Sequence, residues 1–183
     1  LGLELMALSV YVLTGFVRHD SRSNEAALKY VILGALSSAI FLYGVSLVYG
    51  LAGTTQLSEL AITLNRDGPL DPLLILATVF MVTGLVFKVG AVPLHMWVPD
   101  VYEGAPTTIT AFMSVGPKAA AFAIILRIFP DALTGVADIW VPVVAVIAVL
   151  TLTLGSFVAL VQTNIKRMLA YSSIAHVGFA LLG

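Results

Sequence analysis

Long apolar runs separated by short polar stretches constrain the fold of this sequence more than any other feature. Four runs, at residues 27–51, 71–92, 107–127 and 139–161, hold at most one charged residue between their first and last positions. A helix needs about 20 mostly apolar residues to cross the hydrocarbon core of a bilayer. Each of these runs is long enough, so we expect an all-α bundle of transmembrane helices.

Two shorter apolar runs, 1–17 and 168–183, lie at the ends of the sequence. The chain opens inside one and stops inside the other, and no basic segment of the kind that begins a signal peptide precedes the first. We therefore expect the 183 residues to be one transmembrane domain, excerpted from a longer membrane protein.

The composition excludes most other classes of protein. Hydrophobic residues make up 60% of the chain and charged residues only 10%, whereas a soluble domain has roughly 25% charged residues. Nine Lys and Arg residues balance ten Asp and Glu residues, so the chain has no basic face for nucleic acid. The sequence holds no cysteine, which excludes disulfide scaffolds, thiolate zinc sites and cysteine-ligated iron–sulfur clusters.

The run at 71–92 continues into a proline-rich segment that cannot be a regular helix. Pro93, Pro99 and Pro106 interrupt it, and it carries Asp100 and Glu103. Irregular backbone at membrane depth occurs where it lines a cavity or an ion site. We expect a broken helix that extends to about residue 104.

The basic residues outside the runs predict the orientation in the membrane. Two arginines lie in the expected loop at residues 18–25, and Lys166 and Arg167 lie just before the last run. Four expected spans separate these groups, so both lie on one face, which the positive-inside rule makes cytoplasmic. The expected loop at residues 52–69, with Arg66 and Asp67, would then face the other side.

Charges inside the runs are the strongest functional signal. A charged side chain at the bilayer centre costs about 2.5–3.5 kcal/mol even on the lenient insertion scale, so it tends to mark an ion or proton path. Lys118 lies near the middle of its run, directly after Gly116 and Pro117, a pair that loosens a helix and frees backbone carbonyls for a cation or water. The alternative is a lysine that snorkels to the interface.

Lys88 and Glu4 are the next candidates. Lys88 lies close to the expected helix break, although a straight helix would make it an interfacial lysine. Glu4 lies fourteen residues before Arg18, about 21 Å along a helix, unless the start of the first run is itself an interface. A carboxylate at that depth would be protonated unless a cation lay beside it.

Two histidines complete the set of candidates. His176 lies nine residues after Arg167, and His95 lies in the proline-rich segment. Each could relay protons, or each could be a hydrogen-bonded packing residue. Alternating Glu, Lys and His side chains at similar depth suggest a lateral proton relay in the membrane plane, provided that their helices are neighbours.

Two long strings and three short ones resemble a known family. Residues 87–106 read FKVGAVPLHMWVPDVYEGAP and residues 162–174 read QTNIKRMLAYSSI, and both resemble signatures of the antiporter-like subunits of respiratory complex I. Residues 1–5 (LGLEL), 27–30 (ALKY) and 173–179 (SIAHVGF) are similar to the N-type branch of that family of NADH:quinone oxidoreductase subunits.

The resemblance implies a fold of two inverted five-helix units, each with a discontinuous helix, of which this chain holds most of the first unit and the start of the second. It implies that Glu4 is the essential carboxylate, Lys88 the broken-helix lysine and Lys118 the central connecting lysine of a proton-translocating subunit. The chain itself would bind no cofactor, and NADH, FMN, iron–sulfur clusters and quinone would belong to other subunits. Its partners would be those membrane subunits and the lipid bilayer, with no nucleic acid, in a bacterial inner membrane.

Two other functions remain open. A subunit of a multi-subunit sodium/proton antiporter shares both long strings, although the ALKY and SIAH strings favour the respiratory subunit. A non-transporting membrane scaffold would use its buried charges only to pair helices. Such a scaffold predicts that neutralising Lys88 or Lys118 impairs assembly rather than pumping.

Overall fold

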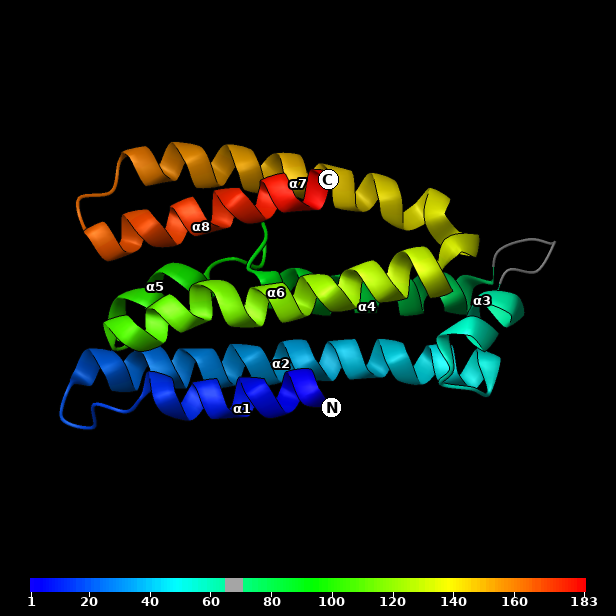
Figure 1. Ribbon diagram of the computed structural model, residues 1–183, viewed down its shortest axis with the longest axis horizontal. Coiled ribbons are helices and arrows are strands. Elements are labelled where there is room, and N and C mark those ends of the chain that lie inside the picture. The colour runs from blue at the N-terminus through cyan, green and yellow to red at the C-terminus, as the bar shows by residue number, and fades with distance from the viewer. Residues whose placement is uncertain (65–70) are drawn as a thin grey trace.

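Helices account for all the regular structure in the part of the chain that the computed structural model describes, residues 1–64 and 71–183. They run roughly along one common axis (Figure 1). In chain order they are α1 (Gly2–Thr14), α2 (Ser21–Ala52), α3 (Leu57–Leu64), α4 (Pro72–Val89), α5 (Trp97–Gly104), α6 (Thr107–Ala132), the 3-10 turn η1 (Thr134–Val136), α7 (Ala137–Leu160) and α8 (Ile165–Leu182).

The helices form layers across the bundle. Figure 1 shows α1 and α2 along one side and α7 and α8 along the other, with α4, α5 and α6 between them. The α2 helix packs along α4, and α7 packs along α8. The α6 helix contacts both α1 and α4. The predicted all-α membrane bundle with a discontinuous helix is therefore confirmed.

Four helical stretches among the described residues are long and apolar enough to cross a membrane. They are Ser21–Ala52, Pro72–Val89, Thr107–Ala132 and Thr134–Leu160, while the apolar α1 helix is shorter. Large apolar side chains lie exposed around the bundle, with Leu160 at 82% and Phe157 at 68% exposure. An apolar outer surface of this kind suits a hydrocarbon surrounding better than water.

Several helix boundaries differ from the sequence-based expectation. The α2 helix begins at Ser21, so the predicted loop is wrong for residues 21–25; the Asp20 side chain accepts a hydrogen bond from the Arg22 amide at 2.9 Å and caps the helix there. The α8 helix begins three residues early, because Asn164 caps it in the same way. The α6 helix continues beyond the predicted end at Arg127 to Ala132.

The predicted loop at residues 52–69 is also wrong in part. The α3 helix occupies Leu57–Leu64, and its Leu60 side chain is buried. The α3 helix packs on α6, since a short amphipathic helix can bury one face against a neighbour. It is too short to span a membrane, so the criterion of a long apolar run did not predict it. Residues 65–70, which include Arg66 and Asp67, lie outside the described residues.

The helix break after α4 follows from Gly90. Its φ of 76° is left-handed, and an added Cβ would lie 2.6 Å from a Val98 methyl group, so the position requires glycine. The Gly90 and Ala91 amides donate back to the Phe87 and Val86 carbonyls. The Val92 amide donates to the Thr151 hydroxyl of α7 at 2.9 Å. The freed backbone groups thus find partners within the protein, as a break at membrane depth requires.

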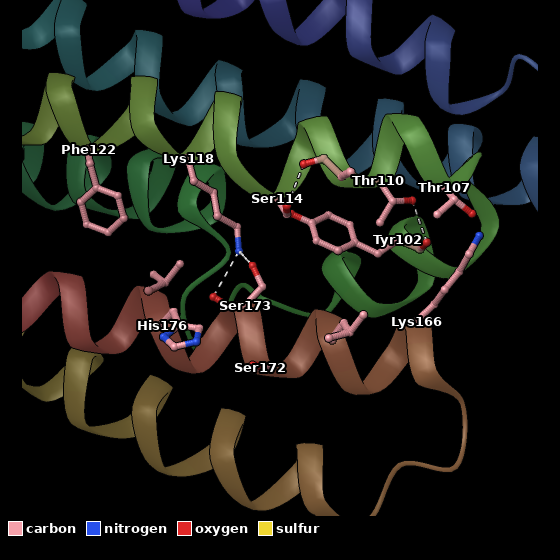
Figure 2. A pocket seen from close by; sticks show the side chains of 13 residues that line it. Tyr102, Thr107, Thr110, Ser114, Lys118, Phe122, Lys166, Ser172, Ser173 and His176 are labelled. Carbon is pink, nitrogen blue, oxygen red and sulfur yellow. Dashed lines mark hydrogen bonds between the residues drawn. The ribbon is translucent and has the colours of Figure 1, made fainter.

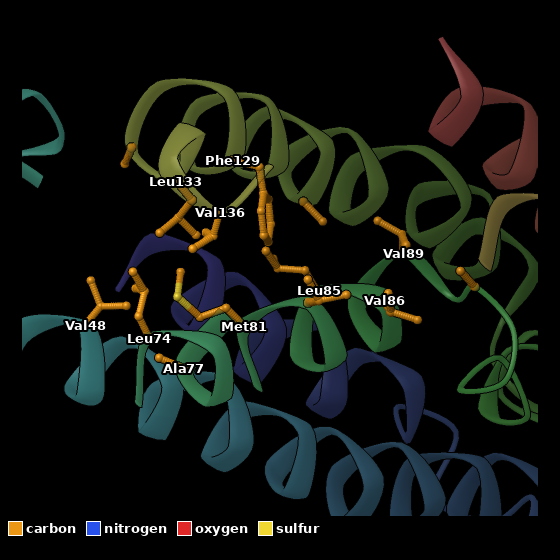
Figure 3. Packing of buried hydrophobic residues seen from close by; sticks show 14 of the residues in the cluster. Val48, Leu74, Ala77, Met81, Leu85, Val86, Val89, Phe129, Leu133 and Val136 are labelled. Carbon is orange, nitrogen blue, oxygen red and sulfur yellow. The ribbon is translucent and has the colours of Figure 1, made fainter. Parts of the chain in front are cut away.

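Close helix approach depends on glycines that face a neighbouring helix. An added Cβ at Gly84 of α4 would lie 2.5 Å from the Phe41 Cβ of α2, and one at Gly155 of α7 would lie 2.7 Å from the Ala175 amide of α8. Lipid tails are as apolar as leucine, so membrane helices associate largely through such close packing. Buried apolar side chains also form a cluster, shown in Figure 3. Its members include Val48, Leu74, Ala77, Met81, Leu85, Val86, Val89, Phe129, Leu133 and Val136.

Candidate functional site

Glu4 and Lys88 form an ion pair in the interior of the bundle. The Lys88 Nζ lies 2.9 Å from a Glu4 carboxylate oxygen, and their side chains are 10% and 26% exposed, respectively. Ser38 of α2 lies against both groups. Its hydroxyl donates to the other Glu4 oxygen at 2.7 Å and accepts a hydrogen bond from Lys88 at 2.9 Å. The three side chains come from α1, α2 and α4, and we call them the first cluster.

The end of α4 helps to hold the charge of Lys88. Lys88 lies in the last turn of α4, two residues before Gly90. Helix C-termini favour cations, because the backbone dipoles add along the axis. The break after α4 therefore ends the helix where its carbonyl end can stabilise the ammonium group inside the bundle.

Lys118 is the centre of a second group of polar side chains, shown in Figure 2. Its side chain is buried, and its Nζ donates to the Ser173 hydroxyl at 2.5 Å and lies 3.4 Å from the Ser173 carbonyl. The ammonium group also lies 5.7 Å from the ring centre of Tyr102, within cation–π range. We call Tyr102, Lys118 and Ser173 the second cluster.

The second cluster opens onto a cavity of about 550 Å³ between α6 and α8. Lys118, Lys166 and His176 line it, together with several hydroxyl groups. The hydroxyl-bearing residues of its lining are Tyr102, Thr107, Thr110, Ser114, Ser172 and Ser173. The cavity is roomy enough for water, and its lining, although mostly apolar, offers hydroxyl groups and charged side chains as partners beside Lys118.

The helix does not break at Gly116 and Pro117, contrary to the loosening that the sequence suggests. The α6 helix runs without interruption from Thr107 to Ala132. Proline has no amide hydrogen, so the carbonyl four residues earlier, that of Met113, loses its helical donor. The buried Tyr102 hydroxyl donates to this carbonyl at 3.1 Å. A carbonyl is freed, as expected, but it accepts a hydrogen bond from a tyrosine hydroxyl rather than from the water, or in place of the cation, that the sequence suggests.

The two candidate histidines lie in different surroundings. His176 is exposed and lines the same cavity as Lys118, so the structure brings these two candidates together. His95 is half-buried in the break, with its ring centre 6.5 Å from that of Tyr171. No hydrogen bond or ion pair joins the first cluster to the second within residues 1–64 and 71–183.

A network of ion pairs ties the short α5 helix to its neighbours. Asp100 accepts from Lys29 of α2 and from Arg167 of α8, both at 2.9 Å, and Arg167 also contacts Glu103 at 3.0 Å. Glu25 completes the network with a 2.7 Å pair to Lys29. Partial burial opposes ionisation of Asp100, but the hydrogen bonds from Lys29 and Arg167 outweigh it and lower the pKa of that carboxyl.

Sequence reasoning found the charged members of both clusters but missed their hydroxyl partners. Ser38 and Ser173 lie inside apolar runs, where a serine usually bonds to a carbonyl of its own helix and carries no functional signal. The ion pairs of Lys29 and Arg167 with Asp100 were missed as well. The acidic residues of the proline-rich segment are their only sign in the sequence.

The whole sequence, residues 1–183, matches the family model described as "NADH:quinone oxidoreductase/Mrp antiporter, TM". A protein of Rhizobium meliloti called NADH-quinone oxidoreductase subunit N 2 is 71% identical over 182 residues, which are 100% of this chain and 38% of that protein. The chain thus spans less than two fifths of this relative's length.

Two solved structures contain chains of the same fold. A chain of respiratory complex I from Thermus thermophilus, solved with bound aureothin, is 41% identical with a TM-score of 0.79, over 98% of this chain and 38% of that one. A chain of the Mrp complex from Dietzia sp. is 27% identical with a TM-score of 0.86, over 98% of this chain and 33% of that one. The backbone is shared with both assemblies, whereas the sequence is more similar to the complex I chain.

Proposed function

Because the chain belongs to the NADH:quinone oxidoreductase/Mrp antiporter transmembrane family, we propose that it is part of a membrane subunit that translocates protons. The observation that carries the proposal is the partly buried Glu4–Lys88 ion pair beside a helix break, with N···O at 2.9 Å. The 71% identity to a relative called subunit N 2 supports a role in NADH:quinone oxidoreductase.

The physical basis is the cost of an unpaired charge in a medium of low dielectric constant. While the pair is closed, Glu4 stabilises the protonated form of Lys88. If a conformational change separates the two, the protonated lysine loses that stabilisation and releases its proton more readily. The proposed step is therefore a switch in which the position of the carboxylate sets whether the lysine keeps its proton.

We assign the second cluster to the exit or entry of protons. Lys118 would exchange protons with water in its cavity, with His176 as a further exchange site. His95, between the clusters in sequence, is a lower-ranked member of the relay. Transfer between Lys88 and Lys118 would need water or a side-chain movement, since they share no hydrogen bond in the described residues.

We assign the redox chemistry to other subunits of the assembly. The sequence has no cysteine with which to hold an iron–sulfur cluster, and NADH, FMN and quinone would be used elsewhere in the complex. Energy would reach this subunit through its contacts with neighbouring membrane subunits, as a coupling free energy between distant sites. The apolar surface would face lipid in a bacterial inner membrane.

The test compares proton pumping with quinone reduction in membranes that carry Lys118→Ala or Glu4→Gln in the full-length subunit. We expect each variant to lower pumping at least about tenfold, the effect of about 1.4 kcal/mol on a barrier, in complexes that assemble normally. Asp138→Asn is the matched control, because Asp138 is exposed at the start of α7. Full pumping by Lys118→Ala would contradict the proposed role of the second cluster.

The second candidate is a subunit of a sodium/proton antiporter, which the similarity to a chain of the Mrp complex favours. It predicts proton movement that depends on a sodium gradient and not on quinone reduction, and vesicles with imposed sodium gradients distinguish the two. A scaffold without transport predicts a third result, in which both variants lose assembled complex and the remaining complex pumps normally.

A further inference from the structure

Ser38 is the side chain that joins both members of the partly buried ion pair. It is 9% exposed and lies in the middle of α2, opposite Lys88 of α4 and Glu4 of α1. Its hydroxyl donates to a Glu4 oxygen at 2.7 Å and accepts from the Lys88 ammonium at 2.9 Å. With the direct 2.9 Å contact between the two charges, these bonds close a ring of three groups.

The bonding partners of Ser38 distinguish it from the buried threonines of the bundle. Thr14, Thr78 and Thr151 each donate to the carbonyl four residues earlier in their own helix, the usual arrangement for a buried hydroxyl in a helix. The Ser38 hydroxyl is instead committed to two side chains on two other helices. It makes no contribution to its own helix that would explain its presence in an apolar run.

We propose that Ser38 is a positioning residue, which holds the Glu4 carboxylate against Lys88 and sets the geometry from which the pair opens. This inference rests on the proposed function of the pair. A hydroxyl is suited to the task because it can donate and accept at the same time. It can also reverse its direction, donating to a neutral lysine and accepting from a protonated carboxyl, so it follows the pair through both protonation states without a net gain or loss of protons.

The neighbouring residue provides a matched control. Ser37 is 5% exposed, lies next to Ser38 in α2, and donates to the Gly84 carbonyl of α4 at 3.2 Å. It has the same size and chemistry and faces the same helix, but it touches neither charge. Loss of its hydroxyl therefore measures the general effect of removing a buried hydrogen bond between α2 and α4.

The experiment uses the assembled complex with Ser38→Ala, Ser38→Thr or Ser37→Ala in the full-length subunit. We expect Ser38→Ala to lower the ratio of protons pumped to quinone reduced about tenfold, the change that follows from losing one charge-assisted hydrogen bond. Ser38→Thr, which keeps the hydroxyl, should restore most of the ratio. Ser37→Ala should pump like the unchanged protein.

Infrared difference spectroscopy measures the Glu4 carboxylate band, which should not change if Ser38 only contributes to the packing of the helices. The carboxylate band that disappears in Glu4→Gln identifies Glu4, and this band should shift in Ser38→Ala but not in Ser37→Ala. Equal pumping and equal bands in the two alanine variants would overturn the proposal. If Ser38→Ala fails to assemble, the band position in Ser38→Thr and in Ser38→Cys, whose thiol is a weaker donor, decides instead.

The same measurements separate this inference from the proposed function. Normal pumping by Glu4→Gln would contradict the function of the ion pair, while a band shift in Ser38→Ala would still support the hydroxyl as the group that holds the carboxylate. Loss of pumping in Glu4→Gln with no effect of Ser38→Ala on pumping or on the band would leave the function standing and overturn the role of Ser38.

Discussion

At the scale of single residues, Pro117 and Tyr102 form a complementary pair. Proline removes the amide hydrogen that would normally bond to the Met113 carbonyl, and the Tyr102 hydroxyl supplies a donor in its place at 3.1 Å. The ring of the same tyrosine lies 5.7 Å from the Lys118 ammonium. Pro117 therefore fixes Tyr102 beside the lysine without breaking α6.

A double-mutant cycle tests this pairing. Tyr102→Phe should lower the free energy of unfolding by about 1–3 kcal/mol, because it leaves a buried carbonyl without a donor. In a Pro117→Ala background the loss should be about 1 kcal/mol smaller, since the backbone amide at position 117 then bonds to Met113. Unfolding of the subunit in mixed detergent micelles measures both values. The exposed Tyr43→Phe is the control, and strictly additive effects of the two changes would refute the pairing.

The candidate charges could be found from the sequence, because a charged residue in an apolar run is visible in one dimension. Counting along each run selected Glu4, Lys88 and Lys118. The ring that contains Ser38 could not be found, because it depends on which faces of α1, α2 and α4 meet. That geometry is set by close contacts such as the one at Gly84, whose added Cβ would lie 2.5 Å from Phe41.

At the scale of elements, the short α5 helix is held in place by buried apolar side chains and by ion pairs. Its Asp100 accepts from Lys29 of α2 and Arg167 of α8, and its last residue, Gly104, allows close approach to the Arg22 carbonyl. The basic residues in the first turn of α8 therefore serve the fold as well as the orientation. Since α5 follows the break that carries Lys88, a shift of α5 would disturb the end of α4.

The lowered pKa of Asp100 predicts how this docking depends on pH. A carboxyl whose pKa is lower in the folded state contributes stability fully above its ordinary value of 3.8, and loses it as the pH falls through the lowered value. Hydrogen exchange of the α5 amides should therefore be faster in Asp100→Asn than in the unchanged protein at neutral pH, and the difference should vanish in strong acid. Added salt should also reduce it, because these side chains are partly exposed.

The control for this prediction is Asp131→Asn, a change of an exposed carboxylate in the last turn of α6. It should leave exchange in α5 unaltered at every pH. A difference between Asp100→Asn and the unchanged protein that persists in strong acid would instead point to a packing defect at position 100. Loss of the ion pairs would then not explain the faster exchange.

The helices of membrane-spanning length were predictable at this scale, whereas the short α3 helix and the helix ends were not. The run at 71–92 contains α4, and the run at 139–161 contains all of α7 except its first two residues, because an apolar run of that length has few other stable forms in a membrane. The starts of α2 and α8 depend on the side-chain caps Asp20 and Asn164. A helix can begin inside a polar stretch that contains a good capping residue. Placing the start of each helix after the last charged residue therefore predicted the starts of α2 and α8 too late in the sequence.

At the scale of the whole molecule, the connections gather at two opposite ends of the bundle. The α1–α2 and α7–α8 connections lie at the end where α5 lies, and α3 lies at the other end (Figure 1). The ion-pair network of Asp100, Lys29 and Arg167 belongs to the first end. The positive-inside rule assigns that end to the cytoplasm. The ion-pair network would therefore lie on the cytoplasmic side of the membrane.

Labelling with a membrane-impermeant thiol reagent tests this orientation directly. The 183 residues contain no cysteine, so single changes at the exposed His19, Thr163 and Thr55 report only their own positions once any cysteine elsewhere in the subunit is replaced by serine. We expect His19→Cys and Thr163→Cys to react from the cytoplasmic side of sealed vesicles, and Thr55→Cys to react from the opposite side. Reaction of all three from one side would contradict the two-ended arrangement. Reaction of the first two from the outside would reverse the orientation, and with it the direction in which the cavity beside Lys118 would exchange protons.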